Sequence, residues 1–369
     1  MTSKDDPAPR IIQPFSARYN LLLATYIKPL EHRVFEAIRD LFGGEVTVLK
    51  GLNYHETAKI IVRKWGKFNV PVAVGLDAER WDQCVSVAGL QWEFETYLAC
   101  FQNDPELRRL LWAQMELVGS CRCSDGFVRY RKRGSRASGV MNTGLGNCLI
   151  ACGILHALMQ HLGIRMEVCN NGDDCTVIME SSDLPRFMEA VRQWFLDFGF
   201  RLKVEEPVYR VEQIEFCQTH PVYDGIRWTM CRDPKTALTK DEVSCIPLKD
   251  KTTFFRFIRS IGEGGMALAG GLPILDAFYS NMLRSSEGYK AFDGEMADLL
   301  SNFTYGSKKL RRQHAPITEP ARESFYFAFG ILPDVQEELE RSLVPYEWTG
   351  CTHAGSIAPH HWWLQGRMW

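Results

Sequence analysis

The sequence predicts an α+β fold, in which strands and helices are mixed up to about residue 220 and helices dominate afterwards. Two observations predict the strands: an apolar, β-branched run at 70–76, and two β-rich runs on either side of residues 170–174. Helical spacing of the apolar residues at 254–261 and 272–283 predicts the helical part. Since no Pro/Gly-rich linker separates the two parts, we expect subdomains packed into one body.

Local patterns then predict each element in order. Pro29 and the apolar positions after it indicate a helix over 29–45 that ends at two glycines. The run 70–76 is predicted to be a buried strand that ends at Asp77. The runs 165–169 and 175–179 flank an Asn-Asn-Gly-Asp-Asp tip and predict a hairpin. Similar patterns predict further helices over 86–101, 141–162 and 185–198, and short strands over 201–204 and 213–217.

Composition excludes several classes of protein. The 369 residues include 43 basic and 45 acidic side chains, so net charge alone indicates neither a nucleic acid nor a membrane partner. No apolar run reaches the about 18 residues that a bilayer span needs, and the polar start lacks a secretory signal. The twelve cysteines include no CxxC pair. We therefore expect free thiols in a reducing compartment and no zinc site.

Four carboxylates occupy positions where a scaffold displays reactive groups. Asp77 and Asp82 lie at and just beyond the end of a predicted strand, and Asp173 and Asp174 lie at the hairpin tip after Gly172. Carboxylates brought together by adjacent strands repel one another unless cations neutralise them. Mg²⁺ suits such a site, and two ions about 3.5–4 Å apart support phosphoryl displacement. Taken alone, the Gly-Asp-Asp triplet is more typical of a solvated turn than of a catalytic site.

Six segments in a fixed order give these residues a more specific context. The chain resembles the RNA-dependent RNA polymerases of positive-strand RNA viruses, specifically those of the tombusvirus family. The resemblance extends from residue 3 to about residue 225, and six motifs at family-like spacing are far more specific than one. The matching segments, in the order of motifs F, A, B, C, D and E, are 4–14 with 18–20, 75–83, 138–148, 170–175, 198–207 and 213–218.

The resemblance implies a two-metal catalytic centre. Asp77 of motif A and Asp173 of motif C would hold Mg²⁺ or Mn²⁺, and Asp174 would be an auxiliary ligand. Lys203 of motif D would donate a proton to the leaving pyrophosphate. The residues alone leave open that Asp174 is a solvated turn charge and that Lys203 is an ordinary surface lysine.

The resemblance also implies a nucleotide site. Lys4, Arg10 and Arg18 would grip the incoming triphosphate, although they are also consistent with surface charges on a mobile terminal segment. Polar side chains of motifs A and B would read the ribose 2′-OH, namely Asp82, Thr143 and Asn147. Ser138 and Gly139 would begin a loop that moves with the template, where simple helix capping is the alternative.

A dense basic cluster at 129–136 suits an RNA backbone, with a solvated charged loop as the alternative. Its cations are Arg129, Arg131, Lys132, Arg133 and Arg136. The partners implied by the resemblance are an RNA template, the nascent strand, NTPs, and an upstream replicase segment or auxiliary replicase protein. The implied location is the host cytoplasm, with recruitment to membrane-bound replication complexes through other segments or proteins.

The implied architecture is a right-hand polymerase. Residues 1–70 would form part of the fingers, 71–220 a palm of antiparallel sheet and helices, and 221–369 a helical thumb and tail. Because motif F begins close to Met1, we expect either a fragment or a readthrough or frameshift extension. Two other functions stay open: a reverse transcriptase, disfavoured by residues suited to a 2′-OH, and a non-catalytic RNA-binding replicase fragment.

Overall fold

The computed structural model describes residues 14–244, 248, 250–294, 310–346 and 348. The chain divides into two compact units. The first, the sheet unit, contains the described residues up to Gly51 together with Arg63–Tyr209. The second, the helical unit, contains Leu52–Val62 and the described residues from Arg210 onward.

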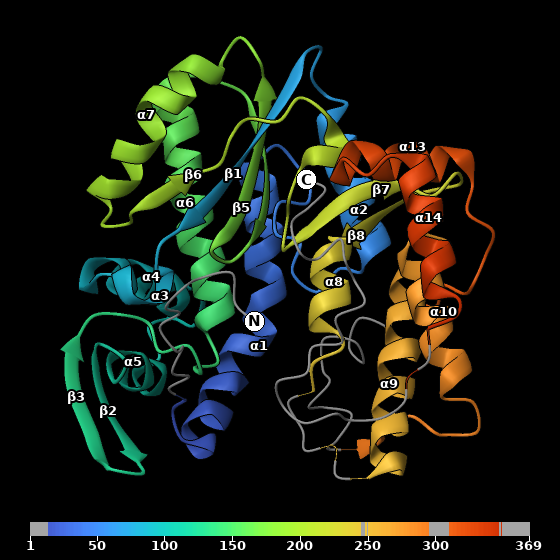
Figure 1. Cartoon of the computed structure of the whole chain (residues 1–369). Helices are drawn as coiled ribbons and strands as arrows, with labels where there is room; N and C mark the ends of the chain where they lie inside the picture. The colour runs from blue at the N-terminus through green and yellow to red at the C-terminus, as the bar shows by residue number, and fades with distance from the viewer. Residues whose placement is uncertain (1–13, 245–247, 249, 295–309, 347, 349–369) are drawn as a thin grey trace. The chain divides into compact units, whose positions relative to one another are not determined.

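A four-stranded antiparallel sheet forms the centre of the sheet unit (Figure 1). Its strands lie in the order β4-β5-β1-β6, and their bounds are Met166–Asn171, Asp174–Glu180, Pro71–Ala78 and Leu202–Val204. The predicted strand and hairpin are therefore confirmed, and β1 continues one residue past Asp77. β1 is buried along most of its length because its valines and alanines pack into the core on both faces.

Helices and one two-stranded ribbon complete the sheet unit. The helices are α1 (Ala17–Leu41), α3 (Trp81–Cys84), α4 (Val87–Cys100), α5 (Pro105–Trp112), α6 (Thr143–Leu162) and α7 (Leu184–Asp197). The ribbon is an antiparallel pair, β2 (Glu116–Cys123) and β3 (Gly126–Arg133). The helices predicted over 86–101, 141–162 and 185–198 correspond to α4, α6 and α7.

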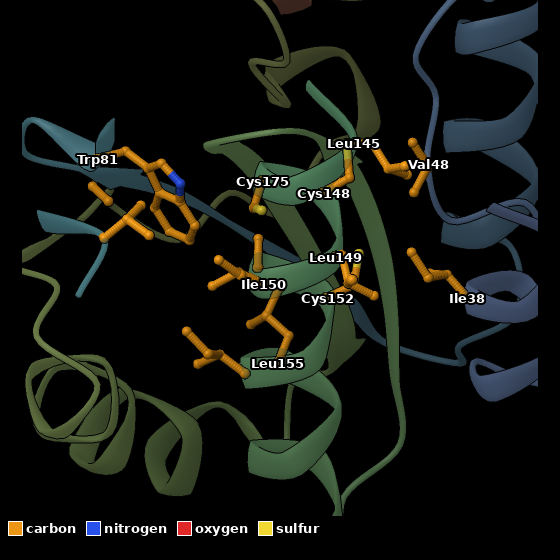
Figure 2. Packing of buried hydrophobic residues seen from close by; sticks show 14 of the residues in the cluster. Ile38, Val48, Trp81, Leu145, Cys148, Leu149, Ile150, Cys152, Leu155 and Cys175 are labelled. Carbon is orange, nitrogen blue, oxygen red and sulfur yellow. The ribbon is translucent and has the colours of Figure 1, made fainter. Parts of the chain in front are cut away.

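α6 is the central helix of this core. Figure 2 shows it lying between Trp81 on one side and Ile38 and Val48 on the other. Its cysteines, Cys148 and Cys152, are buried among these apolar side chains, as a small hydrophobe would be. By length and composition α6 could cross a bilayer, contrary to the sequence expectation. However, 61% of its most apolar stretch is buried inside the protein, which is typical of a core helix.

The first helix differs from its prediction. α1 begins at Ala17 rather than at Pro29, so the proline lies inside the helix. The Ser16 hydroxyl caps α1 by accepting from the Tyr19 N–H at 3.3 Å. Leu23 and Ile27 before the proline and Val34 after it are all buried. Burial along the whole apolar face therefore outweighs the one hydrogen bond that proline cannot donate.

In the helical unit, the segment from Arg210 onward begins with a strand pair that the sequence analysis misplaced. Residues 213–217 do not form the predicted strand; Val211–Gln213 is a 3₁₀ turn, and the strands are β7 (Thr219–Tyr223) and β8 (Trp228–Arg232). Before β7 the chain reverses through Cys217 and Gln218, both left-handed at φ 52° and 58°. Phe216 and Thr219 exchange both of their backbone hydrogen bonds across this turn. A Cys-Gln pair carries none of the usual Asn-Gly signal for such a turn.

From Pro234 onward the described part of the helical unit is mainly helical, as predicted, and Tyr54–Trp65 is a helix that the sequence analysis did not predict. The elements are α2 (Tyr54–Trp65, assigned to this unit up to Val62), α8 (Pro234–Lys240), α9 (Lys251–Ala269), α10 (Leu275–Ser285), α13 (Glu319–Phe329) and α14 (Pro333–Leu343). The helices predicted at 254–261 and 272–283 lie largely within α9 and α10. Aromatic side chains of α9, α10 and α13, among them Phe257, Phe278 and Phe325, form a second hydrophobic core.

Candidate active site

A row of charged side chains crosses the sheet at β1. Asp77 lies directly opposite Asp174 of β5 and, on its other side, directly opposite Lys203 of β6. Facing residues of antiparallel strands present their side chains on the same face, with Cβ atoms about 4.5–5.5 Å apart. The two segments that carry the predicted carboxylates are therefore adjacent, and Asp77 and Lys203 are both exposed to solvent.

The hairpin tip is fixed by its own side chains. Gly172 has a φ of +86°, a conformation that other residues adopt only with strain. Asn170 donates through Nδ2 to the Gly172 carbonyl at 2.7 Å and accepts from the Gly172 N–H at 3.2 Å. Asp173 follows at the tip and is exposed. The turn therefore presents Asp173 to solvent next to the Asp77–Asp174 pair.

The predicted ribose readers lie beside this tip. A Cβ on Gly172 would come within 3.7 Å of the Asn147 Cβ, so the first turns of α6 approach the hairpin. Asn147 donates through Nδ2 to the Asp82 carboxylate at 3.0 Å. Asn147 is 5% exposed, and its Oδ1 has no hydrogen-bond partner among the described residues. This amide oxygen is therefore both buried and unpaired among the described residues.

Motif B begins as a loop held against the start of α1. Pro14 pairs with Gly139 in a parallel bridge, and a Cβ on Gly139 would overlap Pro14. Asn20 donates to the Gly139 carbonyl at 3.1 Å and accepts from the Met141 N–H at 3.0 Å. The Thr143 hydroxyl closes the loop by donating to the Ala137 carbonyl at 2.8 Å. Ser138 and Arg18 are exposed, and Lys4 and Arg10 lie outside the described residues.

A buried ion pair supports this loop and separates Arg136 from the basic cluster. The Arg136 guanidinium donates to both carboxylate oxygens of Glu93, and Asn142 donates to the same carboxylate at 2.8 Å. Burial disfavours the charge, but the adjacent carboxylate outweighs it and holds the pKa of Arg136 above its ordinary value. Arg136 is therefore not on the exposed basic surface, which corrects its grouping with the other four cations.

Sequence reasoning missed Glu93. The residue carries no motif signal, because it lies in α4 between apolar neighbours such as Leu90 and Phe94. The one signal in the sequence is that Glu93 is a single acidic residue on the apolar face of the helix predicted over 86–101. Such a residue is expected to pair with a buried cation.

The remaining basic residues lie on the β2–β3 ribbon, mainly on one face. Successive residues of a strand point to opposite faces, so Arg129, Arg131 and Arg133 share a face. Cross-strand register adds Arg122 of β2 to this face, where its guanidinium lies 5.8 Å from the Phe127 ring centroid. We call these four residues the arginine face. Lys132 points the other way and donates to the Gln83 carbonyl at 3.0 Å.

The carboxylates fit a magnesium site that shares its ligands with a substrate. Within the described residues, no group of three or more His, Cys, Asp or Glu side chains is arranged so that it could hold a metal ion by itself. Mg²⁺ does not need one, because it binds one or two carboxylates, keeps several waters and takes phosphate oxygens from a substrate. Asp77 and Asp174 on paired strands, and the exposed Asp173 at the turn, are carboxylates of the type that such a site uses.

Comparison with known families places the chain among viral polymerases. The family described as "Viral RNA dependent RNA polymerase" matches residues 1–350, and the chain belongs to this family. The chain is 42% identical over 343 residues to the RNA-directed RNA polymerase of Tobacco necrosis virus (strain A). It is 43% identical over 349 residues to that of Turnip crinkle virus. Each match covers 92% of this chain but only 47% and 44% of the respective relative, so the chain spans about half of their length.

Proposed function

We propose that this chain carries the catalytic centre of a viral RNA-directed RNA polymerase, which adds templated ribonucleotides to an RNA 3′ end during genome replication. The observation that supports it most is the register of β1 against β5, in which Asp77 faces Asp174 next to the exposed Asp173. Family membership supports the same reaction. In this proposal residues 1–70 belong to the fingers, 71–220 to the palm, and 221–369 to the thumb and tail.

Asp77 and Asp173, with Asp174 as an auxiliary ligand, would hold two Mg²⁺ or Mn²⁺ ions. When bound, the ions would stabilise the attacking 3′-oxygen and the leaving pyrophosphate oxygen. Lys203, the cross-strand neighbour of Asp77, would supply the proton to the pyrophosphate. The protein's main contribution is positioning, because phosphoryl transfer needs little covalent chemistry from side chains.

Selection of ribonucleotides would depend on the Asp82–Asn147 pair. The hydrogen bond of 3.0 Å between them orients the Asn147 side chain. Its Oδ1 is buried and unpaired among the described residues, and would accept from the 2′-OH of a nucleotide that reaches it. Thr143, Ser138 and Gly139 would shape the loop beside this pair. Arg18, Lys4 and Arg10 would bind the triphosphate of the incoming nucleotide.

Arg122, Arg129, Arg131 and Arg133 of the arginine face would bind the phosphate backbone of the RNA, and Phe127 would offer a ring for stacking. We propose that an upstream replicase segment or an auxiliary replicase protein completes the enzyme. That partner would also recruit it from the host cytoplasm to membrane-bound replication complexes.

The test is incorporation of labelled NTPs on an RNA template by the complete replicase that contains this chain. Asp173→Ala should abolish incorporation, whereas Asp125→Asn, which changes an exposed carboxylate in the β2–β3 turn, should not. Incorporation retained by Asp173→Ala would refute the proposal. Preferential use of dNTPs by the unmodified enzyme would favour a reverse transcriptase instead.

A further inference from the structure

The segment before α2 brings a lysine to the catalytic side of the sheet. Val48 bridges Asn170 in parallel register, and Asn170 bonds to the Thr47 carbonyl and the Leu49 N–H, each at 2.9 Å. This pairing extends the sheet beyond β4 and ends just before Lys50. Asn170 also holds the hairpin turn that carries Asp173. The segment before Lys50 and the turn before Asp173 are therefore both anchored to Asn170.

Contacts of Lys50 place its ammonium at the start of α6. A Cβ on Gly144 would overlap the Lys50 Nζ, so the ammonium lies directly over that glycine. Burial raises the pKa of the Cys148 thiol to about 11, and Lys50 opposes this effect while Asp173 adds to it. Both charges therefore act on Cys148, one turn beyond Gly144. Lys50 itself is exposed and forms no ion pair within the described part of the chain.

The order of the strands places Lys50 opposite Lys203. In the order β4-β5-β1-β6, Lys203 lies on the β6 side of the carboxylates, whereas the Lys50 segment lies beyond β4 at the other edge. In an in-line displacement the attacking and leaving oxygens lie on opposite sides of the phosphorus. If Lys203 faces the leaving pyrophosphate, the β4 side is the side of the attacking strand.

We propose that Lys50 binds a backbone phosphate of the nascent RNA strand close to its 3′ end and so positions the attacking hydroxyl. This inference rests on the proposed function, since it assumes which side the pyrophosphate leaves from. Gly144 is then the residue that makes room for the lysine, because any side chain there displaces the ammonium. A lysine suits this contact as a compact charge that follows a moving phosphate.

The test compares nucleotide incorporation and primer–template binding for Lys50→Ala, Lys50→Arg and Gly144→Ala in the complete replicase on a preannealed primer–template. Lys50→Ala should weaken primer–template binding at least tenfold and leave the NTP KM within about twofold. Lys50→Arg should recover most of the affinity. Lys28→Ala is the control, since Lys28 is an exposed lysine of α1 paired with Glu31.

Gly144→Ala provides the second measurement. The three atoms nearest to its methyl group all belong to the flexible end of Lys50, so the fold should be retained and binding should fall as in Lys50→Ala. The double variant should then be no weaker than Lys50→Ala alone. A raised NTP KM with unchanged primer–template binding, or additive effects of the two substitutions, would overturn the inference. Absence of incorporation by the unmodified replicase would instead refute the proposed function.

Discussion

Glu93→Ala tests how the motif B loop is supported. Glu93 is completely buried and accepts hydrogen bonds from Arg136 at both carboxylate oxygens and from Asn142. Its removal leaves a buried guanidinium without its counter-charge. Breaking a buried ion pair in this way costs about 3–5 kcal/mol. We therefore expect the free energy of unfolding of the sheet unit to decrease by this amount.

The assay is urea unfolding followed by tryptophan fluorescence. Two comparisons separate charge burial from general damage. Glu116→Ala removes an equivalent carboxylate from an exposed pair with Arg131 and should change the midpoint little. Glu93→Leu combined with Arg136→Met removes both charges and should restore much of the loss. A Glu93→Ala midpoint no lower than that of Glu116→Ala would refute the reasoning.

Three further predictions concern the turn, the thiols and the arginine face. Gly172→Ala forces a side chain to φ +86° and should cost about 1–2 kcal/mol in urea unfolding; an unchanged midpoint would contradict it. Cys148, with its pKa raised to about 11 by burial, should resist iodoacetamide at pH 8 while exposed Cys100 reacts, as mass spectrometry would show. In the unfolded chain the Cys148 thiol loses its proton at the ordinary thiol pKa, whereas the folded chain keeps it. The free energy of unfolding should therefore fall as the pH rises above that ordinary pKa. Changing Arg122, Arg129 and Arg133 together to alanine should make the slope of log binding constant against log salt concentration about 2 shallower for RNA. Lys132→Ala should have little effect on this slope. Equal effects of the two changes would contradict the assignment of the arginine face.

Much of the sheet unit could be predicted from sequence because its signals are local. The apolar run of β1 and the Asn-Gly tip of the hairpin each fix a strand through short-range chemistry. The start of α1 could not be predicted in this way. Pro29 reads as a helix start, and only tertiary burial of Leu23 and Ile27 extends the helix through it. The turn at Cys217 and Gln218 was missed because neither residue is typical of a left-handed turn.

The candidate site shows the same division. The order and spacing of the motifs predicted that the segments of Asp77 and Asp174 lie side by side, and the strand register pairs these two residues. Their role as metal ligands, and that of Asp173, stays a prediction. Charge density alone grouped Arg136 with exposed arginines, although its partner Glu93 is distant in sequence and buries it. Composition cannot show on which side of a strand a cation lies, or whether an acid on another helix neutralises it.

The central claim is that Asp77 and Asp173 share divalent ions. Electron paramagnetic resonance of Mn²⁺ titrated into the replicase with Asp77→Asn, Asp173→Asn and the double variant tests it directly. Either substitution should weaken Mn²⁺ binding, and the double variant should lose less affinity than the sum of the two losses, because both substitutions remove ligands from one shared site. Wild-type Mn²⁺ affinity in either single variant would contradict it.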